Sequence, residues 1–253
     1  MHLPENGAEA VDRPSQRDGS SRRRLAFTGA MLVLMLVFTA LGAWQVQRLF
    51  WKLDLIERVE SRVNAEPVQA PTRTQWPDVT AERDEYRHVT ATGQFDHTKE
   101  TFVQAVTELG PGFWVLTPLA TQDGSTILIN RGFVPPERRD QASRPQGQPE
   151  GTVEVKGLLR ISEEGGGFLR SNSPEAGRWY SRDVSAIASA KDLPETAPYF
   201  IDADATPNPG GYPVGGLTVI RFRNTHLVYA LTWFSMALMS GGITYVIWRK
   251  RLL

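Results

Sequence analysis

The chain has 253 residues, and its 28 Lys and Arg residues are matched by 28 Asp and Glu residues, so its charge does not indicate a nucleic-acid partner. Cysteine is absent, which excludes disulfide bonds, thiolate metal sites, a cysteine nucleophile and covalent attachment of c-type haem. The mean hydropathy of −0.30 is too polar for a polytopic membrane protein, although apolar residues gather near both ends of the chain.

The first apolar run, residues 25–46, contains 22 residues without a charged side chain. At a rise of about 1.5 Å per residue, such a run crosses a bilayer as a helix. A cleaved signal peptide is the alternative, but its apolar core usually spans only about 7–15 residues, and Ala40-Leu41-Gly42 is a poor cleavage site. We therefore expect a retained transmembrane helix, preceded by a disordered polar tail over residues 1–24.

A second uncharged run, residues 227–248, predicts another transmembrane helix. Basic residues directly precede the first run and follow the second, so the positive-inside rule places both tails, residues 1–24 and 249–253, in the cytoplasm. The segment between the runs is then periplasmic in a bacterium, or in the intermembrane space of a mitochondrion. Acidic residues in the first tail argue against a transit peptide, so we expect the inner membrane of a bacterium.

The segment between the two runs, residues 47–226, is long enough for one domain with its own core. Apolar residues near helical spacing predict that the first helix continues through residues 47–63. Residues 64–85 contain three prolines and no sustained period, which predicts a surface linker. Short alternating runs separated by turn residues predict a β-rich domain over residues 86–226, with one short helix at 184–190.

The predicted fold class is therefore membrane α+β, with two transmembrane helices flanking a mainly antiparallel β domain outside the cytoplasm. The pattern leaves open whether the sheet closes into a barrel. No motif indicates an enzyme, because HExxH, GxSxG and close histidine pairs are all absent from the sequence. A membrane-tethered hydrolase, the enzymatic alternative, would have only scattered Ser, His and Asp residues for its site.

The best candidate for a ligating residue is His226, at the start of the second run. On a helix it shares one face with Tyr229, Ala230, Trp233 and Ala237, which places one imidazole above an apolar wall with small residues. Such a face suits a planar, lipophilic cofactor. The alternative is that the histidine only marks the level of the lipid headgroups.

Cations and indoles are expected at the same depth. Trp44, Arg48 and Trp51 recur at intervals of four and three on the first helix, and Arg221 and Arg223 shortly precede the second. These arginines would suit the carboxylates of a cofactor. Alternatively, they pair with lipid phosphate, backbone carbonyls or local carboxylates.

Four segments of the sequence resemble successive blocks of the surfeit locus protein 1 family, in order and in spacing. Trp44, Gln45 and Arg48 match within the first block, and Asn130-Arg131-Gly132 within the third; Thr225 and Phe133 depart from the commoner family residues. The likeness extends over residues 25–248. The four blocks are LGAWQVQRLFWKLDLI (41–56), PGFWVLTPL (111–119), LINRGFVP (128–135) and NTHLVYALTWF (224–234).

This resemblance implies an assembly factor for haem-copper cytochrome c oxidase that binds haem a and helps to place it in oxidase subunit I. His226 corresponds to the family histidine proposed as the haem ligand, and so as the residue that binds the metal. The other expected cofactor-binding residues are Trp233 and Tyr229 beside the ring and Arg48, Arg221 and Arg223 at the propionates.

The expected partners are oxidase subunit I, haem a synthase and membrane lipid, and no nucleic acid. Two alternatives stay open at this point. The β domain would act as a scaffold that holds oxidase subunits or the haem synthase together without touching a cofactor, or the cargo would be haem b in place of haem a.

Overall fold

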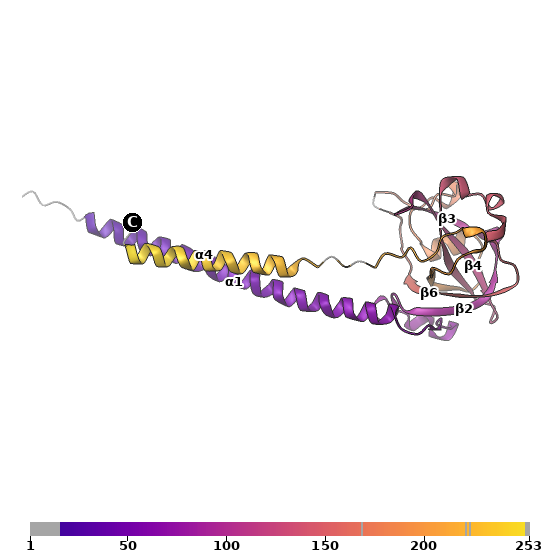
Figure 1. Ribbon diagram of the computed structural model, residues 1–253, viewed down its shortest axis with the longest axis horizontal. Helices are drawn as coiled ribbons and strands as arrows, with labels where there is room; N and C mark the ends of the chain where they lie inside the picture. The colour runs from indigo at the N-terminus through magenta and orange to yellow at the C-terminus, as the bar shows by residue number, and fades with distance from the viewer. Residues whose placement is uncertain (1–15, 168, 221, 223, 251–253) are drawn as a thin grey trace, which may run out of the picture. The chain divides into compact units, whose positions relative to one another are not determined.

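The structure, a computed structural model, describes residues 16–167, 169–220, 222 and 224–250 (Figure 1). The chain divides into two compact units. The helical unit is formed by the two ends of the chain, up to Leu55 and from Phe222 on, and the barrel unit runs from Ile56 to Arg221.

Two long helices dominate the helical unit: α1 is Gln16–Val63 and α4 is His226–Lys250. Neither contains a proline, and each is rich in leucine, alanine and methionine, which favour helix. Both are long and apolar enough to cross a membrane, with mean hydropathies of 2.2 for the most apolar window in Ser21–Val63 and 1.4 for that in His226–Lys250.

The ends of these helices differ in part from the expected boundaries. α1 begins at Gln16, so residues 16–24, which we expected to be disordered, are helical because the apolar run extends its helix into preceding residues that do not break it. Residues 1–15 and 251–253 of the expected tails lie outside the described residues. α1 continues without a break through residues 47–63.

α1 and α4 run antiparallel, and α4 contacts the part of α1 between Thr28 and Gln45. Trp248 Nε1 donates a hydrogen bond of 2.7 Å to Thr28 Oγ1 at one end. In the half of the pair nearer His226, a Cβ atom on Gly42 would lie 2.7 Å from the ring of Phe234, so a larger residue there would displace that ring. Small side chains therefore set the spacing of the helices, as is usual for helices that pair in membranes.

The barrel unit contains a seven-stranded sheet in the order β1-β2-β6-β7-β5-β4-β3, and an additional pairing of β2 with β4 closes the five strands β2, β6, β7, β5 and β4 into a barrel. The pairings β1–β2 and β5–β7 are parallel, and the others are antiparallel. The strands are β1 Val68–Gln69, β2 His88–Phe95, β3 Thr101–Thr107, β4 Gly110–Thr121, β5 Thr126–Val134, β6 Thr152–Ile161 and β7 Thr196–Ala203.

Barrel closure depends on a close approach of two strands at Gly93. The β2–β4 pairing is short, from Gly93 opposite Thr121 to Phe95 opposite Leu119. A Cβ atom on Gly93 would lie 2.3 Å from the backbone oxygen of Ala120, a distance that no side chain tolerates. Glycine at this position therefore permits the hydrogen bonds that close the barrel.

The segment of residues 64–85, which we expected to be a surface linker, is structured and packs on the barrel. It contains β1, the 3₁₀ helix η1 (Arg73–Asp78) and the short helix α2 (Ala81–Asp84). The Tyr199 hydroxyl donates a hydrogen bond of 2.7 Å to the Pro71 carbonyl, and Trp76 packs against the barrel core. The prolines here shape turns against the core and do not mark a free linker.

The barrel core consists of apolar side chains that are at most 4% exposed. A second apolar cluster lies between the sheet and α3 (Val184–Ala190), the one short helix that the sequence predicted in this region. The barrel core residues are Val89, Ala91, Leu119, Ile127, Ile129, Leu159, Ala197, Tyr199 and Ile201.

Candidate functional site

His226 is the first residue of α4, and its ring is oriented by a residue of α1. Nδ1 of His226 lies 2.8 Å from Oε1 of Gln45. An amide oxygen only accepts hydrogen bonds, so Nδ1 carries the proton and a neutral ring presents its lone pair at Nε2. No side chain in the described part of the chain donates a hydrogen bond to Nε2, and the ring is half-buried. The pair offers one imidazole nitrogen for coordination.

The other residues of the predicted stripe on α4 have different surroundings. Ala230 and Ala237 are buried, 2% and 7% exposed, on the side that faces α1. Trp233 stacks on Phe38 of α1 with ring centroids 5.8 Å apart, whereas Tyr229 is 53% exposed. The small residues therefore serve the helix pair, and the open side of the stripe lies at Tyr229.

Of the three predicted cations, Arg48 lies within the described residues. The Arg48 guanidinium lies 4.1 Å from the ring centroid of Trp51, one turn away on α1. Arg221 and Arg223 lie outside the described residues. Lys52, which we did not single out in the sequence, has its ammonium group 4.9 Å from the ring of Phe222, and its spacing of four residues from Arg48 was the available signal.

No metal centre with several protein ligands is present in the described ranges, because no three His, Asp or Glu side chains come together there. A haem iron needs only one or two axial protein ligands, and a neutral histidine is a common one. The single free nitrogen of His226, beside exposed aromatic residues, therefore fits a haem and fits no tetrahedral metal site.

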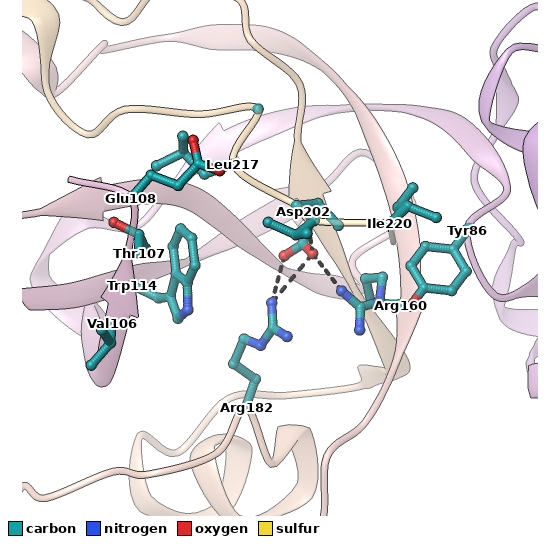
Figure 2. Close-up of a pocket in the computed structure, with 13 residues that line it drawn as sticks. Tyr86, Val106, Thr107, Glu108, Trp114, Arg160, Arg182, Asp202, Leu217 and Ile220 are labelled. Atoms are coloured by element: carbon teal, nitrogen blue, oxygen red, sulfur yellow. Dashed lines mark hydrogen bonds and ion pairs between the residues drawn. The ribbon is translucent and has the colours of Figure 1, made fainter. Parts of the chain in front are cut away.

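The barrel unit contains a separate pocket with a volume of about 510 Å³, which Figure 2 shows. Trp114 and Tyr86 line it, and a charged cluster of Asp202, Arg160 and Arg182 lies between these two rings. Asp202 accepts hydrogen bonds of 2.9 Å from both Arg160 and Arg182. Sequence reasoning did not find this cluster, because its members come from separate strands and loops.

Asp202 is the hub of the cluster. Its carboxylate is 2% exposed and also accepts hydrogen bonds from Asn130, at 2.7 Å, and from Thr218, at 2.9 Å. Glu85 and Glu163 pair with the outer sides of the two arginines. Two guanidinium groups therefore meet three carboxylates, and the cluster braces strands β5, β6 and β7 without leaving a reactive group free.

The pKa values in this cluster follow from the pairing. Burial alone would lower the pKa of Arg160, but Asp202 and Glu85 outweigh it and raise that pKa. Burial alone would raise the pKa of Glu163, but its hydrogen bonds and ion pair with Arg182 hold the pKa below its usual value. Both shifts favour the charged forms of Arg160 and Glu163, as a structural brace requires.

A second buried cluster surrounds Glu100, which is 5% exposed. Its carboxylate accepts a hydrogen bond of 2.5 Å from Arg144 and one of 3.0 Å from Gln141, and Arg131 lies 3.6 Å away. Burial alone would raise the pKa of Glu100, but Arg144, Gln141 and Arg131 outweigh it and lower that pKa. In this cluster the single carboxylate of Glu100 is shared by the guanidinium groups of Arg131 and Arg144.

The Glu100 cluster predicts acid sensitivity. Because the pKa of Glu100 is lower in the folded chain than its ordinary 4.5, its stabilisation is complete above that value and is lost as the pH falls through the folded pKa. We expect the free energy of unfolding to fall below pH 4.5 by at most about 1.4 kcal/mol per pH unit from this carboxyl. Denaturant titrations of the detergent-solubilised chain at several pH values measure the slope. Glu100→Gln should have a shallower slope, and equal slopes would contradict the assignment.

Comparisons with known proteins match nearly the whole chain. The SURF1 family model matches residues 32–238, which include much of α1, the entire barrel and about half of α4. The chain is 38% identical to Surfeit locus protein 1 of Rattus norvegicus over 226 residues, 83% of this chain and 71% of the relative. It is 37% identical to Surfeit locus protein 1 of Homo sapiens over 267 aligned positions, 95% of this chain and 85% of the relative. A SURF1-like protein of Monosiga brevicollis is 37% identical, with 90% and 88% of the two chains covered.

Proposed function

This chain belongs to the SURF1 family, and from that premise we propose that it is a membrane-anchored assembly factor for haem-copper cytochrome c oxidase. In this proposal it binds haem a at the outer face of the inner membrane and aids its insertion into oxidase subunit I, without being an enzyme. Membership of the family supports the role in oxidase assembly. The contact between His226 and Gln45 is the observation that supports the cargo.

In this proposal, each of the predicted site residues has its own role in holding haem. His226 would coordinate the iron through Nε2, with Gln45 fixing the ring by accepting a hydrogen bond from Nδ1–H. Trp233 and Tyr229 would contact the apolar ring, and Arg48, Arg221 and Arg223 would pair with the propionates. One protein ligand holds haem less firmly than two, which suits a protein that must release its cargo.

The proposed topology follows the charges at the ends of the spans. Arg249 and Lys250 occupy the last turn of α4, and Arg22 to Arg24 precede the apolar part of α1. The positive-inside rule then puts both termini in the cytoplasm and the barrel in the periplasm. His226 would lie at the outer boundary of the membrane.

The test of the cargo is spectroscopic. The full chain is purified in detergent from cells that make haem a, and a pyridine haemochrome spectrum identifies the porphyrin. We expect haem a. If the spectrum shows haem b, the proposal that haem a is the cargo is wrong. A preparation without porphyrin would refute haem carriage.

Gln45 provides a sharper prediction, because it touches the ring and would not touch the iron. Gln45→Ala should weaken haem binding by about 10–100-fold, as is typical when the partner that orients a metal-bound histidine is lost. Haem a titration followed at the Soret band measures the affinity. Gln47→Ala, at an exposed position two residues along α1, is the matched control. Equal affinities for the two variants would show that Gln45 does not orient the ligand.

The scaffold alternative draws on the barrel unit. The β3–β4 hairpin exposes Val106 and Leu109, 85% and 54% exposed, as a partner-binding surface would. Exchanging both spans for unrelated ones while keeping the barrel separates the two functions. Retained oxidase assembly would favour the scaffold, and lost assembly would favour haem carriage.

A further inference from the structure

The barrel core borders a second pocket of about 360 Å³, here called the Arg131 pocket. Part of its wall consists of apolar side chains that belong to the core or pack against it. Its polar lining residues are Arg131, Glu154, Lys156, Asp204, Thr206 and Asn208. Pockets of this size that combine an apolar wall with polar groups are typical small-molecule sites. The apolar walls are formed by Phe95, Ile129, Val153, Val155 and Ala203.

Arg131 is buried in this pocket with its hydrogen-bonding capacity only partly used. Its side chain is 2% exposed, and its guanidinium lies 4.8 Å from the ring of Phe95. Nη2 donates to the Gly147 carbonyl at 2.6 Å and to Asn208 Oδ1 at 3.0 Å. Nη1 is buried and has no hydrogen-bond partner among the residues that the structure describes.

The charge around Arg131 is not balanced. Nη1 lies 3.6 Å from Oε1 of Glu100, beyond hydrogen-bond distance, and Glu100 is the one acid within ion-pair distance of Arg131 in the described part of the chain. Arg144 holds that carboxylate by direct hydrogen bonds. The cluster therefore carries one uncompensated positive charge, whereas the Asp202 cluster has an excess of carboxylates. Burial lowers the pKa of Arg131 to about 10, which shows that its charged form is poorly stabilised there. A buried charge without a full partner is costly unless a ligand completes it.

We propose that the Arg131 pocket binds a small organic monocarboxylate, with the carboxylate on the Arg131 guanidinium and its apolar body against the pocket walls. The planar guanidinium fork matches a carboxylate. A single negative charge balances the cluster. Glu154 and Asp204 also line the pocket and would repel a dianion such as a phosphate monoester more strongly.

The test uses the full chain in detergent and para-fluorobenzoate as the probe, observed by fluorine NMR. The uncharged para-fluorobenzamide is the matched ligand control. We expect the benzoate to bind and the amide to bind at least about tenfold more weakly, because only the benzoate completes the charge. Absence of benzoate binding, or equal binding of the two probes, would overturn the proposal.

Two variants locate the site. Arg131→Gln should weaken benzoate binding by at least about tenfold, with Arg178→Gln at an exposed position as its control. Val155→Phe fills the pocket without changing charge and should abolish binding, while Val106→Phe, the same substitution at an exposed position outside the pocket, should not. If Arg131→Gln fails to fold, the comparison of Val155→Phe with Val106→Phe tests where the benzoate binds. Benzoate binding that persists in Val155→Phe would place the ligand elsewhere and refute the assignment.

Discussion

Replacing His226 by alanine is expected to remove haem a from the purified protein. The variant loses the one imidazole nitrogen that the described part of the helical unit offers, and loss of a mere orienting partner already weakens metal binding by about 10–100-fold. We therefore expect the affinity for haem a to fall by more than about 100-fold. The haem content and the Soret position of the purified variant measure the effect. Oxidase activity in membranes should fall in parallel.

Two controls separate ligation from folding. His88→Ala removes a histidine from β2 in the barrel unit, where Nδ1 lies 2.9 Å from the Ala65 carbonyl, and should leave haem content unchanged. Adding imidazole to His226→Gly should partly restore the Soret band, because free imidazole can occupy the vacated position. Unchanged stoichiometry and Soret position in His226→Ala would rule out the histidine as ligand and leave the scaffold as the better explanation.

The sequence predicts only those parts of the architecture that depend on residues close together in the chain. The two apolar runs indicate helices because length and hydropathy are local properties, and α3 was found from its own residues. Barrel closure could not be read, because it depends on three residue pairs between β2 and β4 and on Gly93. Likewise, no local signal pairs β5 with β7 in parallel, since β6 and α3 separate them in the chain.

The candidate site shows the same limit. His226 and Gln45 could each be singled out, one as the start of an apolar run and one within a family block. Their contact joins residues 181 positions apart, and helical periodicity says nothing about which faces of two helices meet. The face with Ala230 and Ala237 looked suited to a cofactor, because a stripe of small residues fits a helix and a flat ligand equally well.

Asp202→Ala should cause the largest loss of stability in the barrel unit. The substitution leaves Arg160 and Arg182, 13% and 12% exposed, without their shared carboxylate, and it also removes the acceptor for Asn130 and Thr218. Breaking a buried ion pair by deleting one partner typically costs about 3–5 kcal/mol, because the remaining charge stays buried and uncompensated. We expect a loss in that range in the free energy of unfolding.

Urea titration of the detergent-solubilised chain, followed by tryptophan fluorescence, measures this loss, since Trp114 and Trp179 both lie in the barrel unit. Asp78→Ala removes an exposed carboxylate from the same unit and should change the free energy by less than about 0.5 kcal/mol. Asp202→Asn keeps the shape but not the charge, so it should resemble alanine if charge is what matters. A loss below about 1 kcal/mol in both Asp202 variants would mean that water or Glu85 and Glu163 satisfy the arginines, and that the cluster does not brace the barrel.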